Sequence, residues 1–163
     1  MLRKNPRKSA VGGLPGLRFA IVASRYNAQY VDAMLRAAKV VLAKAGAAQI
    51  EVLRVPGAFE IPVVAATLAR QSPAFAAVLC LGVILRGATT HAQHIGEAVT
   101  TALMSIQIET GIPMIHEVLL LENKEQARER CLSREHNRGA EAAQTALEMA
   151  RLLQTVRRLE DPE

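Results

Sequence analysis

The sequence predicts an α/β protein, a three-layer α/β/α sandwich around a four-stranded parallel sheet. Apolar segments of strand length alternate along the chain with longer segments in which apolar residues recur at helical spacing. The strand-like segments are apolar throughout, which is typical of parallel strands covered on both faces. With 163 residues, the chain has the length of one such domain.

Four segments are predicted to be strands, and polar or turn-forming residues end each of the first three. The first runs into the polar residues 24–27, the second into Pro56-Gly57 and the third into Arg86-Gly87. The predicted strands are residues 17–23, 50–55, 76–85 and 114–121.

Helical periodicity predicts five helices between and after these strands. In the first, Val31, Leu35, Ala38 and Leu42 fall on one face, and Gly46 is a typical helix end. Right-handed crossovers place the helices on both faces of the sheet, in a flavodoxin-like arrangement, with the binding site beyond the carboxyl ends of the strands. The predicted helices are residues 27–45, 59–69, 89–109, 125–131 and a last one from residue 139.

The positive charge of the chain is concentrated at its N-terminus. The net charge is +5, and five basic residues with no acidic one fall within the first 18 positions. From residue 19 onward, the 15 remaining basic residues balance the 15 acidic ones. We therefore predict a basic, flexible tail over residues 1–16, a single domain over 17–158 and a C-terminal tail over 159–163. The distribution favours a flexible extension over the alternative, an arm that binds nucleic acid.

The composition also indicates in which compartment the protein works and whether it binds a metal. No apolar run approaches the ~18 residues of a membrane span, and the N-terminus lacks the apolar core of a secretory signal. The two cysteines, Cys80 and Cys131, form neither a disulfide framework nor a metal-binding spacing. His91 and His94 lie one helical turn apart but have no third ligand at a recognisable spacing. We expect a cytoplasmic protein without a metal.

Candidate site residues follow the first two predicted strands. Tyr26 and Phe59 are aromatic rings in polar loops, and each is either a half-buried loop ring or a ring that stacks on a flat heterocycle. Glu60 is either a charge matched to a helix dipole or an acceptor for the hydroxyl groups of a polyol.

The turn after the third strand is the strongest candidate. A glycine turn that opens a helix presents free backbone N–H groups to an anion. Thr89 either contributes to this cradle or is the N-cap of the helix, and Arg86 alone is more often a structural arginine. His91 lies in the first helical turn, where an imidazole suits proton transfer at neutral pH. The later arginines are either a solvated helix face or phosphate ligands; they are Arg128, Arg130, Arg134 and Arg138.

Five segments together resemble the lumazine synthase family, in the family order and near its spacing. They are residues 24–27, 55–62, 81–91, 125–130 and 137–143. The resemblance implies a transferase of riboflavin biosynthesis that condenses 5-amino-6-(D-ribitylamino)uracil with 3,4-dihydroxy-2-butanone 4-phosphate to 6,7-dimethyl-8-ribityllumazine, phosphate and water. It implies no cofactor and no metal.

The resemblance also implies roles for individual residues. Ala88 and Thr89 hold the phosphate at the helix N-terminus, His91 transfers protons, Arg130 binds the phosphate and Arg138 lies near the pyrimidine ring. The ring and the ribityl chain lie against residues from the first three strand ends, with the tyrosine stacked on the ring. These residues are Tyr26, Asn27, Ala58, Phe59, Glu60, Val83, Ile84 and Leu85.

Family members are built on homopentamers with the site between neighbouring subunits, and the pentamers pair or close into an icosahedral shell. The sequence departs from the family pattern at residues 119–121 and 133–136 and at three positions near the site. These are Gln93, where a carboxylate often follows the catalytic histidine, and His116-Glu117, usually an aromatic residue and glycine beside the pyrimidine. The alternative function is a divergent paralogue that keeps the fold and assembly and binds flavin or lumazine or forms a shell.

Overall fold

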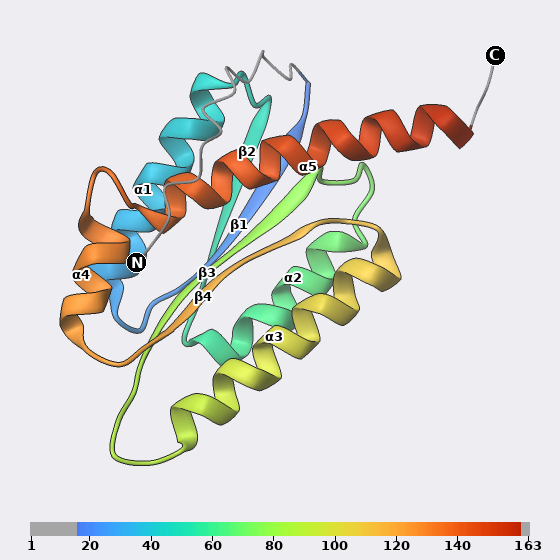
Figure 1. Cartoon of the computed structure of the whole chain (residues 1–163). Helices are drawn as coiled ribbons and strands as arrows, with labels where there is room; N and C mark the ends of the chain where they lie inside the picture. Colours follow the sequence, from blue (N-terminus) through green and yellow to red (C-terminus); the bar gives the residue numbers. More distant parts are fainter. Residues whose placement is uncertain (1–15, 161–163) are drawn as a thin grey trace.

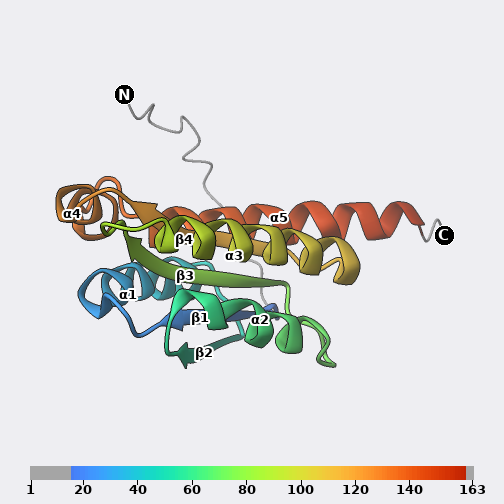
Figure 2. The ribbon, with the colours of Figure 1, turned by 90° about the horizontal axis from the view of Figure 1, so that it is seen from below.

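The computed structural model describes residues 16–160, and the side chains of 16–159. Its four strands form one all-parallel sheet in the order β2-β1-β3-β4. The strands are β1 (Arg18–Ser24), β2 (Gln49–Val55), β3 (Ala77–Leu85) and β4 (Met114–Leu121). In Figure 2 the strands run towards α4, and the C-terminal end of α5 lies on the opposite side of the molecule.

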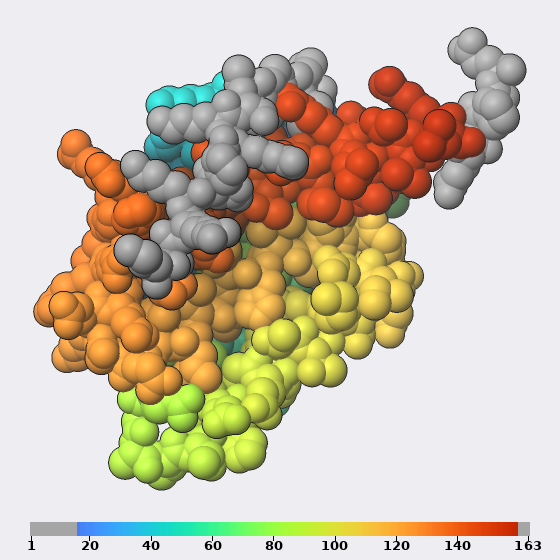
Figure 3. Space-filling model, viewed as in Figure 1, coloured from blue at the N-terminus to red at the C-terminus, as the bar shows by residue number. Residues whose placement is uncertain are grey.

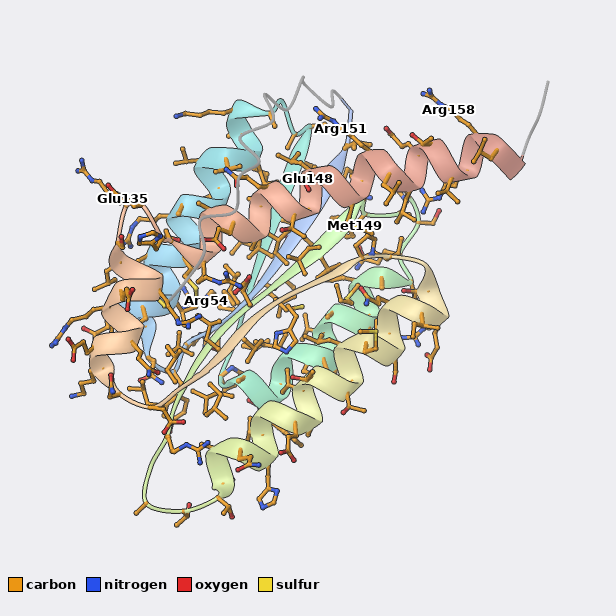
Figure 4. All side chains as sticks on the ribbon, in the orientation of Figure 1. Arg54, Glu135, Glu148, Met149, Arg151 and Arg158 are labelled. Atoms are coloured by element: carbon orange, nitrogen blue, oxygen red, sulfur yellow. The ribbon has the colours of Figure 1, made fainter. Side chains whose placement is uncertain are left out.

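Helices cover both faces of the sheet (Figure 1), as predicted. One layer holds α1 (Ala28–Lys44) and α5 (Arg138–Glu160), with α4 (Lys124–Leu132) packed beside α1. The other holds α2 (Ile61–Ala69) and α3 (His91–Thr110). Met149 of α5 packs against the core on the side of the helix that faces the sheet, whereas Arg158 projects from the end of α5 (Figure 4).

Two hydrophobic cores lie on opposite faces of the sheet. In β1, the side chains of Phe19 and Ile21 enter the core beneath α1 and α5, and those of Ala20 and Val22 enter the core beneath α2 and α3. All four are 0% exposed. This two-sided burial explains why the strand segments are apolar without alternation.

Two helices begin two residues later than their apolar periodicity predicts. A short 3-10 turn, η1 (Ala58–Glu60), precedes α2, which begins at Ile61 rather than at residue 59. Glu60 accepts a hydrogen bond from the backbone N–H of Gly57 at 2.9 Å and so closes this turn. Similarly, α3 begins at His91 rather than at residue 89.

The last helix begins one residue before its predicted start at residue 139. It also extends beyond residue 158, the predicted end of the domain. Asn137 Oδ1 accepts a hydrogen bond from the N–H of Gly139 at 2.9 Å, so it caps a helix whose first residue is Arg138. The helix then continues to Glu160. The predicted N-terminal tail, except residue 16, and residues 161–163 lie outside the described residues. Within residues 16–160, no helix combines the length and apolarity that crossing a membrane requires.

Candidate active site

The ends of the first three strands are tied together by hydrogen bonds. The N–H of Tyr26 donates to the carbonyl of Pro56 at 3.1 Å, which joins the loop after β1 to the loop after β2. Asn27 Nδ2 donates to the carbonyl of Val83 at 2.7 Å and so joins the same loop to β3. Asn27 has φ 56°, a left-handed conformation that asparagine tolerates better than most residues.

Arg54 of β2 fixes the end of β1 from the other side, between the sheet and α1 (Figure 4). Its guanidinium donates to the carbonyls of Ala23 at 3.2 Å and Ser24 at 2.9 Å. The carboxylate of Asp32 on α1 pairs with Arg54 at 2.7 Å. The loop that bears Tyr26 and Asn27 therefore starts from a fixed strand end.

The loops after β1 and β2 enclose one side of an open cavity of about 880 Å³ at the carboxyl ends of β1, β2 and β3. The volume is in the range of small-molecule sites. The loop from β3 to α3 forms an open bend (Figure 1), and its residues Gly87 and Thr89 line the edge of the cavity. Ten of the predicted site residues line the cavity, namely Tyr26, Asn27, Ala58, Phe59, Glu60, Val83, Ile84, Leu85, Thr89 and His91.

Two aromatic side chains are exposed at this cavity. Tyr26 is 74% exposed and Phe59 is 61% exposed, whereas Phe19, Tyr30 and Phe75 are at most 2% exposed. The chain has no other aromatic residue. Tyr26 is therefore not the half-buried loop ring of the first alternative, and both rings are free to cover a flat ligand.

Glu60 presents a carboxylate beside these rings. Its Oε2 accepts from the N–H of Gly57, and a Cβ on Gly57 would lie only 3.0 Å from that oxygen. A side chain at position 57 would displace the carboxylate, so the glycine is required for this geometry. Within residues 16–160, Oε1 of Glu60 has no hydrogen-bond partner and is available to a ligand hydroxyl.

The β3–α3 turn has the free N–H groups that the sequence predicts. Thr90, not Thr89, is at the N-cap position of α3, and its side chain makes no capping hydrogen bond. Thr89 Oγ1 accepts from the N–H of His91 at a long 3.4 Å. Arg86 pairs with Glu122 at 3.0 Å and thus has the structural role that was one of its alternatives. The start of α3 can therefore receive an anion through its backbone.

Four predicted site residues do not line the cavity of this chain. Ala88 lies in the turn between two residues that do line it. His116 is on β4, Arg130 is in the last turn of α4 and Arg138 begins α5. The described residues contain no carboxylate within salt-bridge distance of Arg130. Its charge is therefore available to a ligand or to a neighbouring subunit.

His116 lies in a separate open groove of about 530 Å³ between β4 and α3 (Figure 3). Its Nδ1 accepts the N–H of Val118 at 3.1 Å, so Nε2 carries the proton and donates to Thr100 Oγ1 at 2.7 Å. The Thr100 hydroxyl in turn donates to the carbonyl of Gly96 at 2.7 Å. Burial lowers the pKa of His116 from its ordinary value of 6.5, although an interaction of the ring with the backbone of His116 itself raises it in part.

The lowered pKa of His116 predicts a pH dependence of stability. The unfolded chain takes up the proton more readily than the folded chain, so the free energy of unfolding should fall as the pH drops below about 6.5. In His116→Phe this fall should be smaller, as measured by denaturant unfolding at several pH values. His94→Gln, which removes an exposed imidazole, is the control. Identical pH profiles for wild type and His116→Phe would contradict the assignment.

Glu117 and Arg138 form a pair that the sequence did not predict. Glu117 is 7% exposed and accepts from Arg138 Nε at 3.0 Å and from Nη2 at 2.9 Å. Glu141, one turn into α5, accepts from Nη1 of the same arginine at 2.5 Å. Burial raises the pKa of Glu117 above its ordinary value, and the charge of Arg138 opposes this rise.

Comparison with known proteins identifies the family. The family model for 6,7-dimethyl-8-ribityllumazine synthase matches residues 16–154. The chain belongs to this family. A 6,7-dimethyl-8-ribityllumazine synthase of Xanthomonas oryzae pv. oryzae (strain PXO99A) is 42% identical over 142 residues, covering 86% of this chain and 92% of that protein. One of Stenotrophomonas maltophilia (strain R551-3) is 43% identical over 139 residues, covering 84% and 89%.

Lumazine synthases are the transferases of riboflavin biosynthesis, and the chain is an enzyme of this class. The resemblance inferred from five sequence segments is thereby confirmed. The alternative of a non-catalytic paralogue is not favoured, because the relatives with 41–43% identity are named as the synthase.

Several cavity residues of this lumazine synthase were not among the predicted ones. Gly57 and Gly87 belong to the predicted loops but have no reactive side chain. Ala92, His94, Ile95 and Ala98 also line the cavity, on the face of α3 that follows His91. Helical spacing from His91 was the signal that could have indicated positions 94, 95 and 98. Residues 16–160 contain no group of three or more His, Cys, Asp or Glu side chains placed to hold a metal.

Proposed function

We propose that the cavity binds 5-amino-6-(D-ribitylamino)uracil and that the chain condenses it with 3,4-dihydroxy-2-butanone 4-phosphate. The observation that carries this proposal is the pairing of two exposed aromatic rings, Tyr26 and Phe59, with a free helix N-terminus at the same cavity. The rings suit a flat pyrimidine, and the helix N-terminus suits a phosphate.

The pyrimidine substrate is proposed to lie against Tyr26, with the backbone groups of residues 83–85 hydrogen-bonded to its ring. Glu60 Oε1 is proposed to accept hydrogen bonds from the ribityl hydroxyls. The exposed rings and the free carboxylate oxygen of the described chain support this orientation.

The chemistry proceeds through an imine. The uracil amine attacks the ketone with loss of water, phosphate leaves by elimination, and ring closure with a second loss of water gives the lumazine. Holding both substrates in reacting geometry supplies on the order of 7–11 kcal/mol. His91 shuttles protons in these steps and adds ~10²–10⁴-fold. The proposed reaction uses no cofactor.

The phosphate is proposed to bind at Ala88 and Thr89, with Arg130 of a neighbouring subunit completing the site. In Arg130→Ala, the KM for the four-carbon phosphate should therefore rise by ~10–100-fold, because charge-assisted hydrogen bonds are lost. Arg128→Ala, an exposed arginine on the same helix, is the matched control. Steady-state kinetics with each substrate varied in turn measures the effect, and equal KM values in the two variants would contradict it.

The assembly is proposed to be built on homopentamers. Large apolar side chains are exposed on α3 and α5, as is typical of subunit contacts. They are Met104, Ile108, Leu152, Val156 and Leu159. A neighbouring subunit that covers the open cavity would bring a second set of polar residues to the substrates, and His116, Arg130 and Arg138 are proposed to be in that set.

Turnover by the purified chain tests the proposed function. Mixed with both substrates, the protein should generate the absorbance and fluorescence of 6,7-dimethyl-8-ribityllumazine without an added metal. Binding of the pyrimidine substrate without turnover would contradict the proposal and would favour a binding protein.

A further inference from the structure

Glu117 is the only buried charged side chain among residues 16–159. It lies on β4 with its side chain towards Arg138 of α5, on the face of the sheet opposite to that of His116, which bonds to Thr100 of α3. Burial of a carboxylate costs several kcal/mol unless it is paired and hydrogen-bonded. Arg138 supplies this pairing through two parallel hydrogen bonds, from Nε and Nη2.

The two carboxylates fix the guanidinium in one orientation. Glu117 takes one N–H from Nε and one from Nη2, and Glu141 takes one from Nη1. A guanidinium has five N–H donors in one plane. The two remaining donors of Arg138, on Nη1 and Nη2, therefore point in a direction set by Glu117 and Glu141.

The same pairing removes the net positive charge of the arginine. With both carboxylates ionised, the positive charge of Arg138 is balanced by Glu117 and Glu141, and the charge of Arg130 also acts on Glu117. Such a paired arginine attracts a phosphate less than an unpaired one would, and it still offers directed N–H donors to a neutral carbonyl. Arg130 has no such carboxylate within salt-bridge distance among the described residues. The two arginines thus suit different ligand groups, phosphate for Arg130 and carbonyl oxygen for Arg138.

We propose that Glu117 is a positioning residue that directs the Arg138 guanidinium at a carbonyl oxygen of the pyrimidine. The proposal rests on the proposed function, in which Arg138 lies near the pyrimidine. Glu117 itself touches no substrate. A lysine, with one point charge, would need no such partner to orient it.

A double-mutant cycle of Glu117→Gln and Arg138→Met tests the proposal. Glutamine keeps the size of the side chain but turns one acceptor into a donor that faces an arginine N–H. In Glu117→Gln, the KM for the pyrimidine substrate should rise about tenfold, with the KM for the four-carbon phosphate within about twofold of wild type. In the Arg138→Met background the same change should have no further effect on either KM.

Two further measurements separate positioning from a structural role. Glu117→Asp keeps the charge but cannot reach both Nε and Nη2. In the assembled variant, the KM for the pyrimidine substrate should therefore rise selectively, but less than in Glu117→Gln. Fluorescence titration with 6,7-dimethyl-8-ribityllumazine should show weakened binding in both Glu117 variants. Equal changes in both KM values, a change that persists without Arg138, or an unchanged pyrimidine KM in Glu117→Asp would overturn the proposal. Absence of turnover in the wild type would overturn the proposed function instead, and the titration would still test the role of Glu117.

Discussion

Replacing His91 by alanine is expected to lower kcat for lumazine formation by ~10²–10⁴-fold while leaving the reaction measurable. His91 is the first residue of α3 and lines the cavity beside Thr89. Proton transfer is one contribution to the rate, whereas the aromatic rings, the helix N-terminus and the neighbouring subunit still hold both substrates together. Single-turnover measurements with saturating substrates isolate the chemical step.

His94→Ala is the matched control for this prediction. It removes an imidazole from the same cavity one helical turn farther along α3, and we expect a smaller loss of kcat. Complete inactivity of His91→Ala in an intact assembly would contradict the claim that positioning of the substrates supplies part of the rate enhancement without His91. A kcat equal to that of the wild type would contradict the role of His91 itself.

Gly139→Ala is expected to destabilise the fold by at least about 3 kcal/mol. A Cβ at this position would lie 2.0 Å from the carbonyl oxygen of Met34 and 2.5 Å from its carbonyl carbon. Both atoms are backbone of α1, so α1 and α5 would have to separate. Because α5 begins with Arg138, the substitution should also displace the Glu117–Arg138 pair.

Gly96→Ala is the control for this effect, since it also places a Cβ on a helical glycine. There the new atom would meet Leu120 at 3.6 Å, an ordinary contact. We expect this variant to be as stable as the wild type or more stable, because alanine favours a helix over glycine by about 1 kcal/mol. Denaturant unfolding and the yield of assembled protein compare the two. Equal stability of the two variants would contradict the close packing of α1 against α5.

The order of the elements was predictable because each strand of this sheet is buried on both faces. Apolar runs without alternation therefore marked the strands, and helical spacing marked the helices between them. The helix starts were less predictable because they depend on individual hydrogen bonds. Glu60 closes a turn before α2, and Asn137 caps α5 one residue earlier than the glycine suggested.

The cavity was predictable to the extent that it lies at strand ends. Parallel strands bring their carboxyl ends to one edge, so Tyr26, Phe59 and His91 were expected together, and all three line one cavity. The Glu117–Arg138 pair was not predictable, because its partners are 21 residues apart and no local pattern links them. Residues supplied by another subunit have no signature in the periodicity of one chain.

The central claim is that one site combines the cavity of one subunit with Arg130 of the next. Coexpression of His91→Ala and Arg130→Ala subunits in mixed assemblies tests it most directly. If the two residues come from different subunits, some interfaces pair an intact His91 with an intact Arg130, and random equal mixing should restore roughly a quarter of the wild-type kcat/KM. If both residues served the site from the same chain, every site would carry one substitution, and the mixed assemblies would be no more active than the average of the two variants.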